Sequence, residues 1–430
     1  SVTHTSIFSL QPKKVDSVAI IQEETEEPEA SSESDSVERA RLIGRVVSGI
    51  ILISVGIISG FNPSPAALWA LVNTLDIIIY IPLSRNSLTP DLKAFLEGLD
   101  IMELIIPNFL EFALDPDTSS NPNETFSDFR FESTLFLLNI GSKFTIFCLV
   151  LLLWPAVWML SKTTIPFVAK ICQIFLPQYK YNVLLRGWIL VYLDLLTASL
   201  IQVSNAPSSD GVIVSNYCIG VIFGLLLGFT PLGLLIFNIK NKNKIVSEDL
   251  DFYGYCGTLF YEYKCQEKYL ASHTYLLFFL KRALFAISLV LFTDYPVLQH
   301  TINLVLMVGY AAFIMTMKPF KQKLDQLVSM FVEVGICLLF IGCYYFLQDS
   351  SRDGDEGMQY TLICFILAII IVQSLAAILP LVLRIIKSYK DKSTEKYKVP
   401  ETPALEVPRG NQLPEEGQGE PNASSEEPNR

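Results

Sequence analysis

Residues 211–238 read GVIVSNYCIGVIFGLLLGFTPLGLLIFN and contain no Asp, Glu, Lys or Arg. A helix rises about 1.5 Å per residue, so a helical run of this length exceeds the ~30 Å thickness of a bilayer's hydrocarbon core. So long a stretch without charge is typical of a membrane-spanning helix. This run therefore sets the interpretation of the rest of the chain.

Similar apolar runs lie on both sides of it, at residues 42–61, 66–83, 134–160, 183–203, 273–292, 298–317, 326–347 and 360–386. The chain has 430 residues, of which 51% are hydrophobic and 17% charged. Soluble domains usually have about 25% charged residues, so the composition also favours lipid. We predict an all-α fold, a polytopic transmembrane helix bundle of about nine spans.

The polar ends of the chain divide it into three regions. Residues 1–41 are acidic and are predicted to form an extracellular stalk, and residues 42–387 form the transmembrane helical domain. Residues 388–430 are rich in Pro, Glu, Gly and Asn, which predicts a disordered cytoplasmic tail. The net charge of −11 lies mostly in the two ends, and it gives no indication of a nucleic-acid partner.

Lysine and arginine alternate between the loops as the positive-inside rule describes. One set of loops, together with the start of the tail, holds Lys162, Lys170, Lys180, Lys240, Lys242, Lys244, Lys264, Lys268, Lys318, Lys321, Lys323, Arg384, Lys387, Lys390, Lys392, Lys396 and Lys398. The alternate loops hold only Arg85, Lys93, Arg130 and Arg352. The pattern predicts a cytoplasmic C-terminus and, with nine crossings, an N-terminus on the opposite side.

Two features bear on the N-terminal side of this topology. The sequon Asn123-Glu124-Thr125 lies in the exterior loop 84–132, where Asn123 is a candidate glycosylation site. Arg39, Arg41 and Arg45 oppose the pattern, because they precede the first run on its exterior side. If the first two runs form a re-entrant hairpin, or if one does not span, the N-terminus is cytoplasmic instead.

Six ionisable residues lie well inside apolar runs, and each costs about 2.5–3.5 kcal/mol at the centre of a bilayer, so each should face the bundle interior. They are Asp76, Lys143, Asp194, Lys281, Arg282 and Glu333. Three acids and three bases suit buried ion pairs that fix helix register, or a path for ions or protons. For Lys281 and Arg282 we favour the interpretation as buried ion pairs. The two residues could instead mark an interfacial helix. Asp76, one turn from Asn73, and Asp194, one turn from Thr197, are the preferred pathway candidates.

The run at 211–238 also contains small residues at a regular spacing. Gly220, Gly224 and Gly228 recur every four residues and predict a groove on one helix face that admits a close neighbour. Ordinary helix packing is the favoured interpretation. The alternative is that Pro231 makes a hinge, because proline removes a helical hydrogen bond.

Enzyme chemistry has little support in the sequence. No phosphate-binding glycine loop, zinc-protease helix or histidine beside a nucleophile is visible, so we expect no catalytic residues, no metal site and no cofactor. The expected partners are the lipid bilayer and a second copy of the chain. The basic cluster Arg384–Lys398 is either part of the positive-inside signal, which we favour, or a contact for anionic lipid.

Some short motifs resemble a known family. The loop Tyr253–Lys264 (YGYCGTLFYEYK) is followed by Lys281-Arg282, by Asp294–Gln299 (DYPVLQ), and by Lys318-Pro319-Phe320. This order resembles the C-terminal membrane domain of TRP-like proteins of the polycystin-related, flavin-carrier type. It also resembles the membrane regions that end large cysteine-rich surface proteins of protozoa, where Trp69–Leu75 and Ile106-Pro107-Asn108 are similar too.

This resemblance implies a plasma-membrane or secretory-pathway protein with a large exterior domain upstream and a role in cation permeation, calcium above all. The chain departs from a conventional TRP pore between its last two runs. Residues 348–358 extend at most ~40 Å, which leaves no room for a pore helix and filter. The leading hypothesis is a membrane domain that conducts or regulates cations, and the alternative is a receptor or adhesion anchor for an extracellular domain.

Overall fold

The computed structural model describes residues 30–61, 66–84, 88–100, 108–112, 124–127, 129, 131, 133–177, 184–205, 211–347 and 356–396. The regular structure of these residues is helical, apart from an isolated antiparallel bridge between Tyr263 and Phe320. The helices up to Leu381 belong to one compact unit, and Val382–Arg430 forms a second unit.

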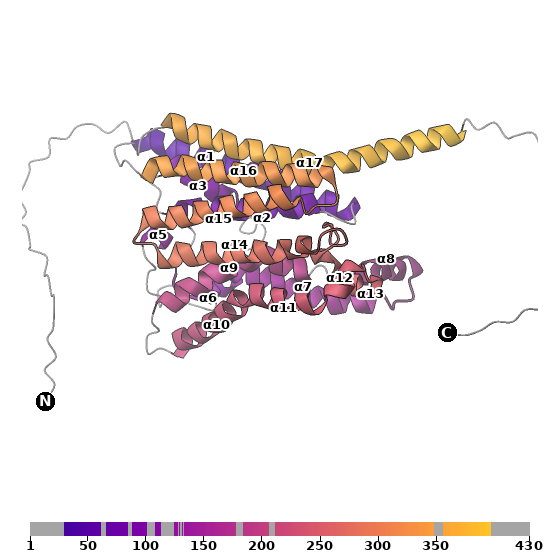
Figure 1. The fold of residues 1–430 in the computed structure, drawn as a ribbon. Coiled ribbons are helices and arrows are strands. Elements are labelled where there is room, and N and C mark those ends of the chain that lie inside the picture. The colour runs from indigo at the N-terminus through magenta and orange to yellow at the C-terminus, as the bar shows by residue number, and fades with distance from the viewer. Residues whose placement is uncertain are drawn as a thin grey trace, which may run out of the picture. The chain divides into compact units, whose positions relative to one another are not determined.

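The long helices lie side by side in the first unit, to which α17 belongs as far as Leu381 (Figure 1). They are α1 (Ala30–Phe61), α2 (Ala66–Ile79), α7 (Gly141–Leu160), α9 (Leu184–Ser204), α10 (Gly211–Gly228), α11 (Thr230–Lys240), α14 (Thr274–Leu291), α15 (Pro296–Met317), α16 (Lys323–Leu347) and α17 (Glu356–Lys396). Short helices connect them, namely η1 (Ile81–Ser84), α3 (Pro90–Gly98), η2 (Phe109–Phe112), α5 (Glu124–Ser127), α6 (Phe136–Asn139), α8 (Pro166–Pro177), α12 (Lys242–Val246), α13 (Leu250–Cys256), η5 (Gly257–Leu259) and η6 (Tyr269–His273).

Among the described residues, 6 helical segments are long and apolar enough to cross a membrane. They are Leu185–Ser204, Gly211–Lys240, Tyr269–Leu291, Pro296–Met317, Lys323–Tyr344 and Gly357–Leu379. The chain is therefore a helical membrane protein, as predicted. The runs predicted at 42–61, 66–83 and 134–160 fold as α1, α2 and α7. Of these, α2 has 14 residues, fewer than the roughly 20 that a perpendicular crossing requires.

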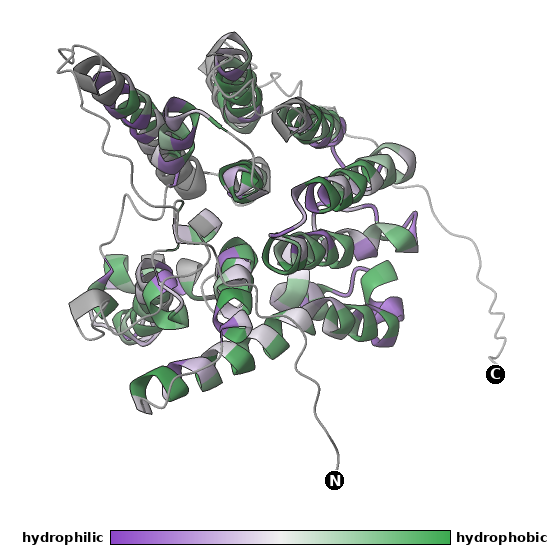
Figure 2. Ribbon diagram, turned by 90° about the vertical axis from the view of Figure 1, so that its left-hand side faces the viewer, coloured by the Kyte–Doolittle hydropathy of each residue, from purple (hydrophilic) through white to green (hydrophobic). Residues whose placement is uncertain are grey.

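Helix α9 occupies the centre of this packing. Of its spanning segment, 67% is buried within the protein, against 17% for Gly211–Lys240. It packs against α10, α14 and α2, and the series continues from α14 to α15 and from α15 to α16. Figure 2 views these helices nearly end-on and shows that hydrophobic residues dominate most of them.

Helix α17 fits closely against α16 and α2. A Cβ atom at Gly335 or Gly342 of α16 would lie 2.9 Å from the end of the side chain of Ile369 or Leu362, respectively, so a larger residue would have to displace these side chains. Gln373 of α17 donates its amide N–H to Thr74 Oγ1 of α2 at 3.1 Å. The three helices are thereby fixed in register.

Two loops meet at the end of the bundle where α8, α12 and α13 gather (Figure 1). The backbone N–H of Lys264 donates to Pro319 O, and that of Lys321 donates to Glu262 O, both at 2.8 Å. Helix α15 ends at Lys318, whose left-handed φ of 48° turns the chain into this pairing. The lysine-rich loops predicted to be cytoplasmic therefore share one end of the helices, and they hold Glu262 beside the start of α16.

Helix α1 begins at Ala30, inside the segment predicted as a stalk, and its first half packs on α3. Gly44 and Gly98 approach so closely that neither has room for a Cβ atom. Arg41 forms an ion pair with Glu97 at 2.8 Å, so one of the three arginines that oppose the positive-inside pattern is neutralised locally. At the other end of the chain, α17 continues to Lys396, into the segment predicted as a disordered tail.

The glycines of the predicted packing groove differ in their surroundings. A Cβ atom at Gly220 would lie 3.0 Å from Gln202 Cγ, and one at Gly224 would lie 3.4 Å from Ser199 Cβ, both on α9. No described atom lies within 4 Å of the same place at Gly228. The close approach of α10 to α9 is therefore made by the first two glycines, while Gly228 precedes an interruption of the helix.

That interruption is Phe229, and Pro231 lies in the first turn of α11 that follows. A proline has no N–H to bond the carbonyl four residues earlier, which here belongs to Leu227. Tyr192 of α9 donates its hydroxyl to Leu227 O at 3.0 Å, and both residues are fully buried. A neighbouring helix thus satisfies the acceptor that the proline leaves open.

We expect Tyr192→Phe to lower the free energy of unfolding by about 1–3 kcal/mol, because it leaves a buried carbonyl without a donor. In a Pro231→Ala background the alanine N–H bonds the same carbonyl, so the cost of Tyr192→Phe should shrink. Denaturant unfolding of the four proteins in detergent gives the coupling energy. Equal costs in the two backgrounds would contradict the assignment.

Candidate functional site

The middle of α14 carries two adjacent cations, Lys281 and Arg282, both buried. Successive residues of a helix point about 100° apart, so the two side chains leave α14 in different directions. Arg282 reaches α2 and α9, and Lys281 reaches α15 and α16. One turn of α14 therefore connects four other helices.

Arg282 is 0% exposed, and both terminal nitrogens of its guanidinium have acceptors, while Nε has no hydrogen-bond partner among the described residues. Its Nη1 lies 3.1 Å from Asp76 Oδ2 and donates to Ile189 O at 3.3 Å, while Nη2 donates to Asn73 O at 2.7 Å. The guanidinium also lies over the ring of Phe278, 4.5 Å from its centroid. The ion pair with Asp76 and the two carbonyls compensate for removing this charge from water.

A second pair joins α7 to α9. Lys143 Nζ lies 2.9 Å from Asp194 Oδ2 and 4.0 Å from Asp100 Oδ2, and all three side chains are at most 8% exposed. Tyr80 donates its hydroxyl to Asp194 as well. This cluster is enclosed by packed side chains.

The third pair lies between α14 and α16. Lys281 Nζ is 3.1 Å from Glu333 Oε1 and 3.0 Å from Oε2, and it lies 4.0 Å from the centroid of the Tyr310 ring on α15. The six ionisable residues singled out in the sequence are thus brought together as three ion pairs, each between different helices. Lys281 and Arg282 lie within the candidate span Tyr269–Leu291.

We expect Asp76→Asn to destabilise the folded protein by about 3–5 kcal/mol, since it leaves the buried Arg282 guanidinium without a counter-charge. Glu97→Gln is the matched control, because it breaks the exposed Arg41–Glu97 pair, whose side chains are 42% and 31% exposed. That change should cost less than about 1 kcal/mol. Unfolding in detergent checks both values, and similar costs would show that the Asp76–Arg282 pair is not sealed from water.

The Lys281–Glu333 pair borders a cavity of about 100 Å³ between α2, α14, α15, α16 and α17. Its described lining includes three carboxylates, Glu262, Asp325 and Glu333, against one lysine. Asp76 and Asp194 are not among the residues that line it. Of the three intramembrane acids, the structure therefore places Glu333 at the cavity, Asp194 in an enclosed pair, and Asp76, with 15% of its side chain exposed, in a pair outside the cavity lining.

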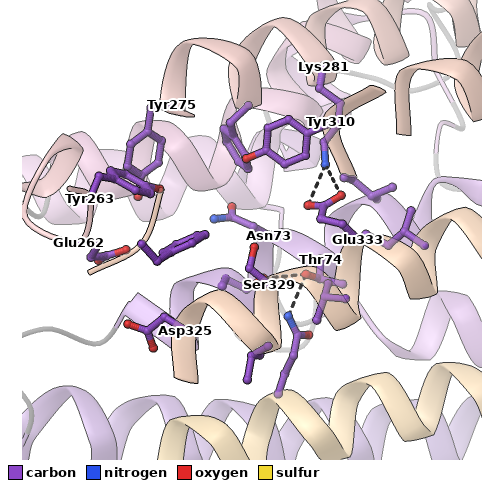
Figure 3. A pocket seen from close by; sticks show the side chains of 18 residues that line it. Asn73, Thr74, Glu262, Tyr263, Tyr275, Lys281, Tyr310, Asp325, Ser329 and Glu333 are labelled. Carbon is purple, nitrogen blue, oxygen red and sulfur yellow. Dashed lines mark hydrogen bonds and ion pairs between the residues drawn. The ribbon is translucent and has the colours of Figure 1, made fainter. Parts of the chain in front are cut away.

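The lining residues form rows along the helices. Asp325, Ser329 and Glu333 follow one another at four-residue spacing on α16, and the row rises about 12 Å. Figure 3 shows Glu262 and Asp325 toward one end of the cavity and the Lys281–Glu333 pair toward the other. The Glu262 end is the one formed by the paired loops.

Two amide side chains, Asn73 and Gln373, also line the cavity. Their oxygens, Asn73 Oδ1 and Gln373 Oε1, are buried and have no hydrogen-bond partner among the described residues. Gln373 is 1% exposed, so its oxygen is withdrawn from bulk water. Carboxylate and amide oxygens without donors make the cavity suited to a positively charged group or to a hydrogen-bond donor.

Glu262 lies outside the six spanning segments, and its protonation is sensitive to its neighbours. Burial raises the pKa of Glu262 to about 7, and the negative charge of Asp325 on α16 adds to this, while the positive charge of Arg186 on α9 opposes it. The ring of Tyr275 on α14 lines the same cavity. Near neutral pH this carboxyl group therefore changes charge.

A raised pKa means that folding favours the protonated carboxyl group, so the stability from Glu262 is greatest at low pH and is lost as the pH rises through about 7. We expect the stability of the unmodified protein relative to Glu262→Gln to fall by about 1 kcal/mol between pH 6 and pH 8. Thermal unfolding at the two pH values measures this difference. An unchanged difference would place Glu262 in contact with water.

Sequence reasoning missed Glu262, Asp325 and Gln373. Glu262 lies in a polar loop, Asp325 precedes the apolar run at 326–347, and glutamine carries no charge. The four-residue spacing of Asp325, Ser329 and Glu333 is the signal that points to a common helix face. His300, near the start of α15, is fully buried, with Nε2 2.6 Å from Phe340 O on α16.

Other predicted features lie beyond what the structure describes. Asn123 lies outside the described residues, as do the basic side chains of Arg384–Lys398. Within the described ranges no group of three or more His, Cys, Asp or Glu side chains is arranged to hold a metal ion. No protein-family model, curated protein or solved structure matches the chain.

Proposed function

We propose that this protein conducts or regulates cations across a membrane, and that cations enter it at the cavity beside Glu333. The observation that carries the proposal is the charge of the described cavity lining, with three carboxylates against one lysine. A concave, acid-lined surface with low-dielectric walls concentrates positive ions. The proposal includes a TRP-like organisation of the membrane domain, because the loop motifs resemble those of TRP-like proteins.

The Lys281–Glu333 pair is proposed to close the inner end of the cavity. The lysine ammonium occupies the place beside Glu333 that a mobile cation would take, at 3.0 Å from its carboxylate. Farther along α14 and α16 the rings of Phe285 and Phe340 are fully buried and in edge contact, so the cavity does not continue between them. Cation passage then requires the pair to separate, which makes it a barrier rather than part of an open pore.

The proposed topology has about nine crossings, with α1, α2 and α7 completing the set, and the Glu262 end of the cavity in the cytoplasm. Its support is the gathering of the lysine-rich loops at one end of the helices (Figure 1). The N-terminus and the loop with Asn123 then face the exterior or lumen of the plasma membrane or a secretory-pathway membrane.

A receptor or adhesion anchor is the second candidate. Two of the three charge pairs, Asp76–Arg282 and Lys143–Asp194, contribute no residue to the cavity lining, as a bundle with a purely mechanical role would have them. In that case the cavity has no part in function, and cation flux is absent.

Reconstitution of the full chain into liposomes separates the two. We expect a cation current or dye-reported flux that falls severalfold in Asp325→Asn, because the loss of one of three carboxylates lowers the local cation concentration. Glu333→Gln should reduce flux further or change its selectivity. Glu97→Gln, on the exposed face of α3, is the control and should leave flux unchanged.

Asp325→Asn keeps the test decisive if Glu333→Gln fails to fold with Lys281 unpaired. Absence of flux in the unmodified protein, or equal flux in Asp325→Asn and Glu97→Gln, would reject conduction through this cavity and favour the anchor.

A further inference from the structure

Aromatic rings form much of the cavity wall beside the carboxylates. Tyr275 and Phe278 lie on α14, Tyr310 lies on α15, and Tyr263 and Phe320 come from the paired loops. The ring centroids of Tyr263 and Phe320 are 5.2 Å apart, and those of Tyr263 and Tyr275 are 5.7 Å apart. The faces of such rings attract organic cations, because their π electrons make them partly negative.

The inner end of the cavity already shows how an ammonium group is held here. Lys281 Nζ lies 3.0 Å from a Glu333 oxygen and 4.0 Å from the centroid of the Tyr310 ring. A carboxylate and a ring face together bind this primary ammonium group. Its burial at 4% exposure shows that the combination compensates for lost hydration.

The outer end repeats these components without a basic residue in its described lining. Glu262 and Asp325 supply carboxylates there, and Tyr263, Tyr275 and Phe320 supply rings. Asn73 and Gln373 also line the cavity, and their side-chain oxygens have no donor among the described residues. Gln373 is almost completely buried, so an acceptor without a partner at this place indicates a missing donor.

We propose that the cavity binds a primary alkylammonium group in its outer half, with the N–H bonds directed to Asp325 or Glu262 and to the amide oxygens of Gln373 and Asn73. A primary ammonium has three donors and no acceptor, which matches a lining of acceptors. The inference deepens the proposed function, on which it rests, by naming the class of cation that the cavity takes.

Geometry favours an organic cation over a single divalent metal ion. Calcium requires six to eight oxygens at about 2.3–2.6 Å from one point, which brings several carboxylates together. The described carboxylates form no such group, and Asp325 and Glu333 are separated by about 12 Å along α16. Rings and spaced acceptors suit a cation that carries an apolar chain.

The size of the cavity agrees with this class of ligand. Its volume of about 100 Å³ exceeds the roughly 30 Å³ share of one water molecule and is smaller than the ~150 Å³ cavity known to admit benzene. A ligand of a few heavy atoms fits. Such a group belongs either to a free small amine or to the ethanolamine head group of a membrane lipid, and the chemistry of recognition is the same.

The test uses the purified full chain in neutral detergent, with ethylammonium, tetramethylammonium and sodium chlorides compared at equal ionic strength by isothermal titration and thermal unfolding. We expect ethylammonium to bind and to raise the unfolding temperature. Tetramethylammonium has the charge but no N–H donors, so it should bind at least tenfold more weakly, and sodium should match the ionic-strength control.

Variants locate the site. We expect Gln373→Leu and Asp325→Asn each to weaken ethylammonium binding about tenfold or more, while Glu97→Gln leaves it unchanged. Addition of phosphatidylethanolamine in mixed micelles, with phosphatidylcholine as comparison, identifies the source. Competition by phosphatidylethanolamine alone indicates a lipid head group, and ethylammonium binding without lipid competition indicates a free amine.

Binding that is equal for the three cations, or unchanged in both cavity variants, would overturn the inference. The outcome is separate from that of the flux experiment, because binding in detergent requires no transport. A protein that passes cations and binds no ethylammonium loses this inference alone. One that binds ethylammonium through Asp325 and passes no ions keeps the site and loses conduction.

Discussion

The structure depends on placing two adjacent cations inside a membrane domain. Each buried charge costs several kcal/mol unless a counter-charge and further hydrogen bonds meet it. Arg282 obtains Asp76 and two backbone carbonyls, and Lys281 obtains Glu333 and the ring of Tyr310. Because these partners come from α2, α9, α15 and α16, the requirement to neutralise one turn of α14 fixes the positions of four helices. Apolar packing alone has no comparable selectivity for register, since most positions on these helices are hydrophobic.

The two cations differ in what surrounds them, and this difference separates structure from function in the bundle. Arg282 is enclosed completely, and so is the cluster of Lys143 with Asp194, Asp100 and Tyr80. The Lys281–Glu333 pair is enclosed on one side and borders a cavity on the other. Under the proposed function, a cation that enters the cavity competes with Lys281 for Glu333. The interaction that is proposed to close the cavity would then also make it responsive to a ligand.

The sequence predicted the features that depend on local composition. Long apolar runs predicted the helices. The alternation of lysine-rich and lysine-poor loops along the chain agrees with the gathering of the lysine-rich loops at one end of the helices. The six intramembrane charges were found because a charge in an apolar run is rare, but their pairing was open, since the partners lie far apart in the chain, 206 residues in the case of Asp76 and Arg282. The number of membrane crossings was harder to predict from the sequence, because an apolar run can be longer than the helix that it forms. The run at 66–83 contains α2, which has 14 residues. Glu262, Asp325 and Gln373 were missed because nothing in a loop carboxylate or a single glutamine marks it as part of a cavity.

The paired loops contain motifs that were visible in the sequence, and they also form part of the cavity that was not. Segments 262–264 and 319–321 are joined by two backbone hydrogen bonds, and they belong to the motifs that carry the resemblance to TRP-like proteins. Their pairing places Glu262 and Phe320 at the outer end of the cavity, next to Asp325 in the first turn of α16. Because α15 ends and α16 begins within this short connection, a ligand that draws Asp325 and Glu262 together acts directly on the relative position of the two helices. Helix α16 also carries Glu333 two turns farther along, so the proposed occupancy of the outer half and the proposed closure by Lys281 would involve the same helix.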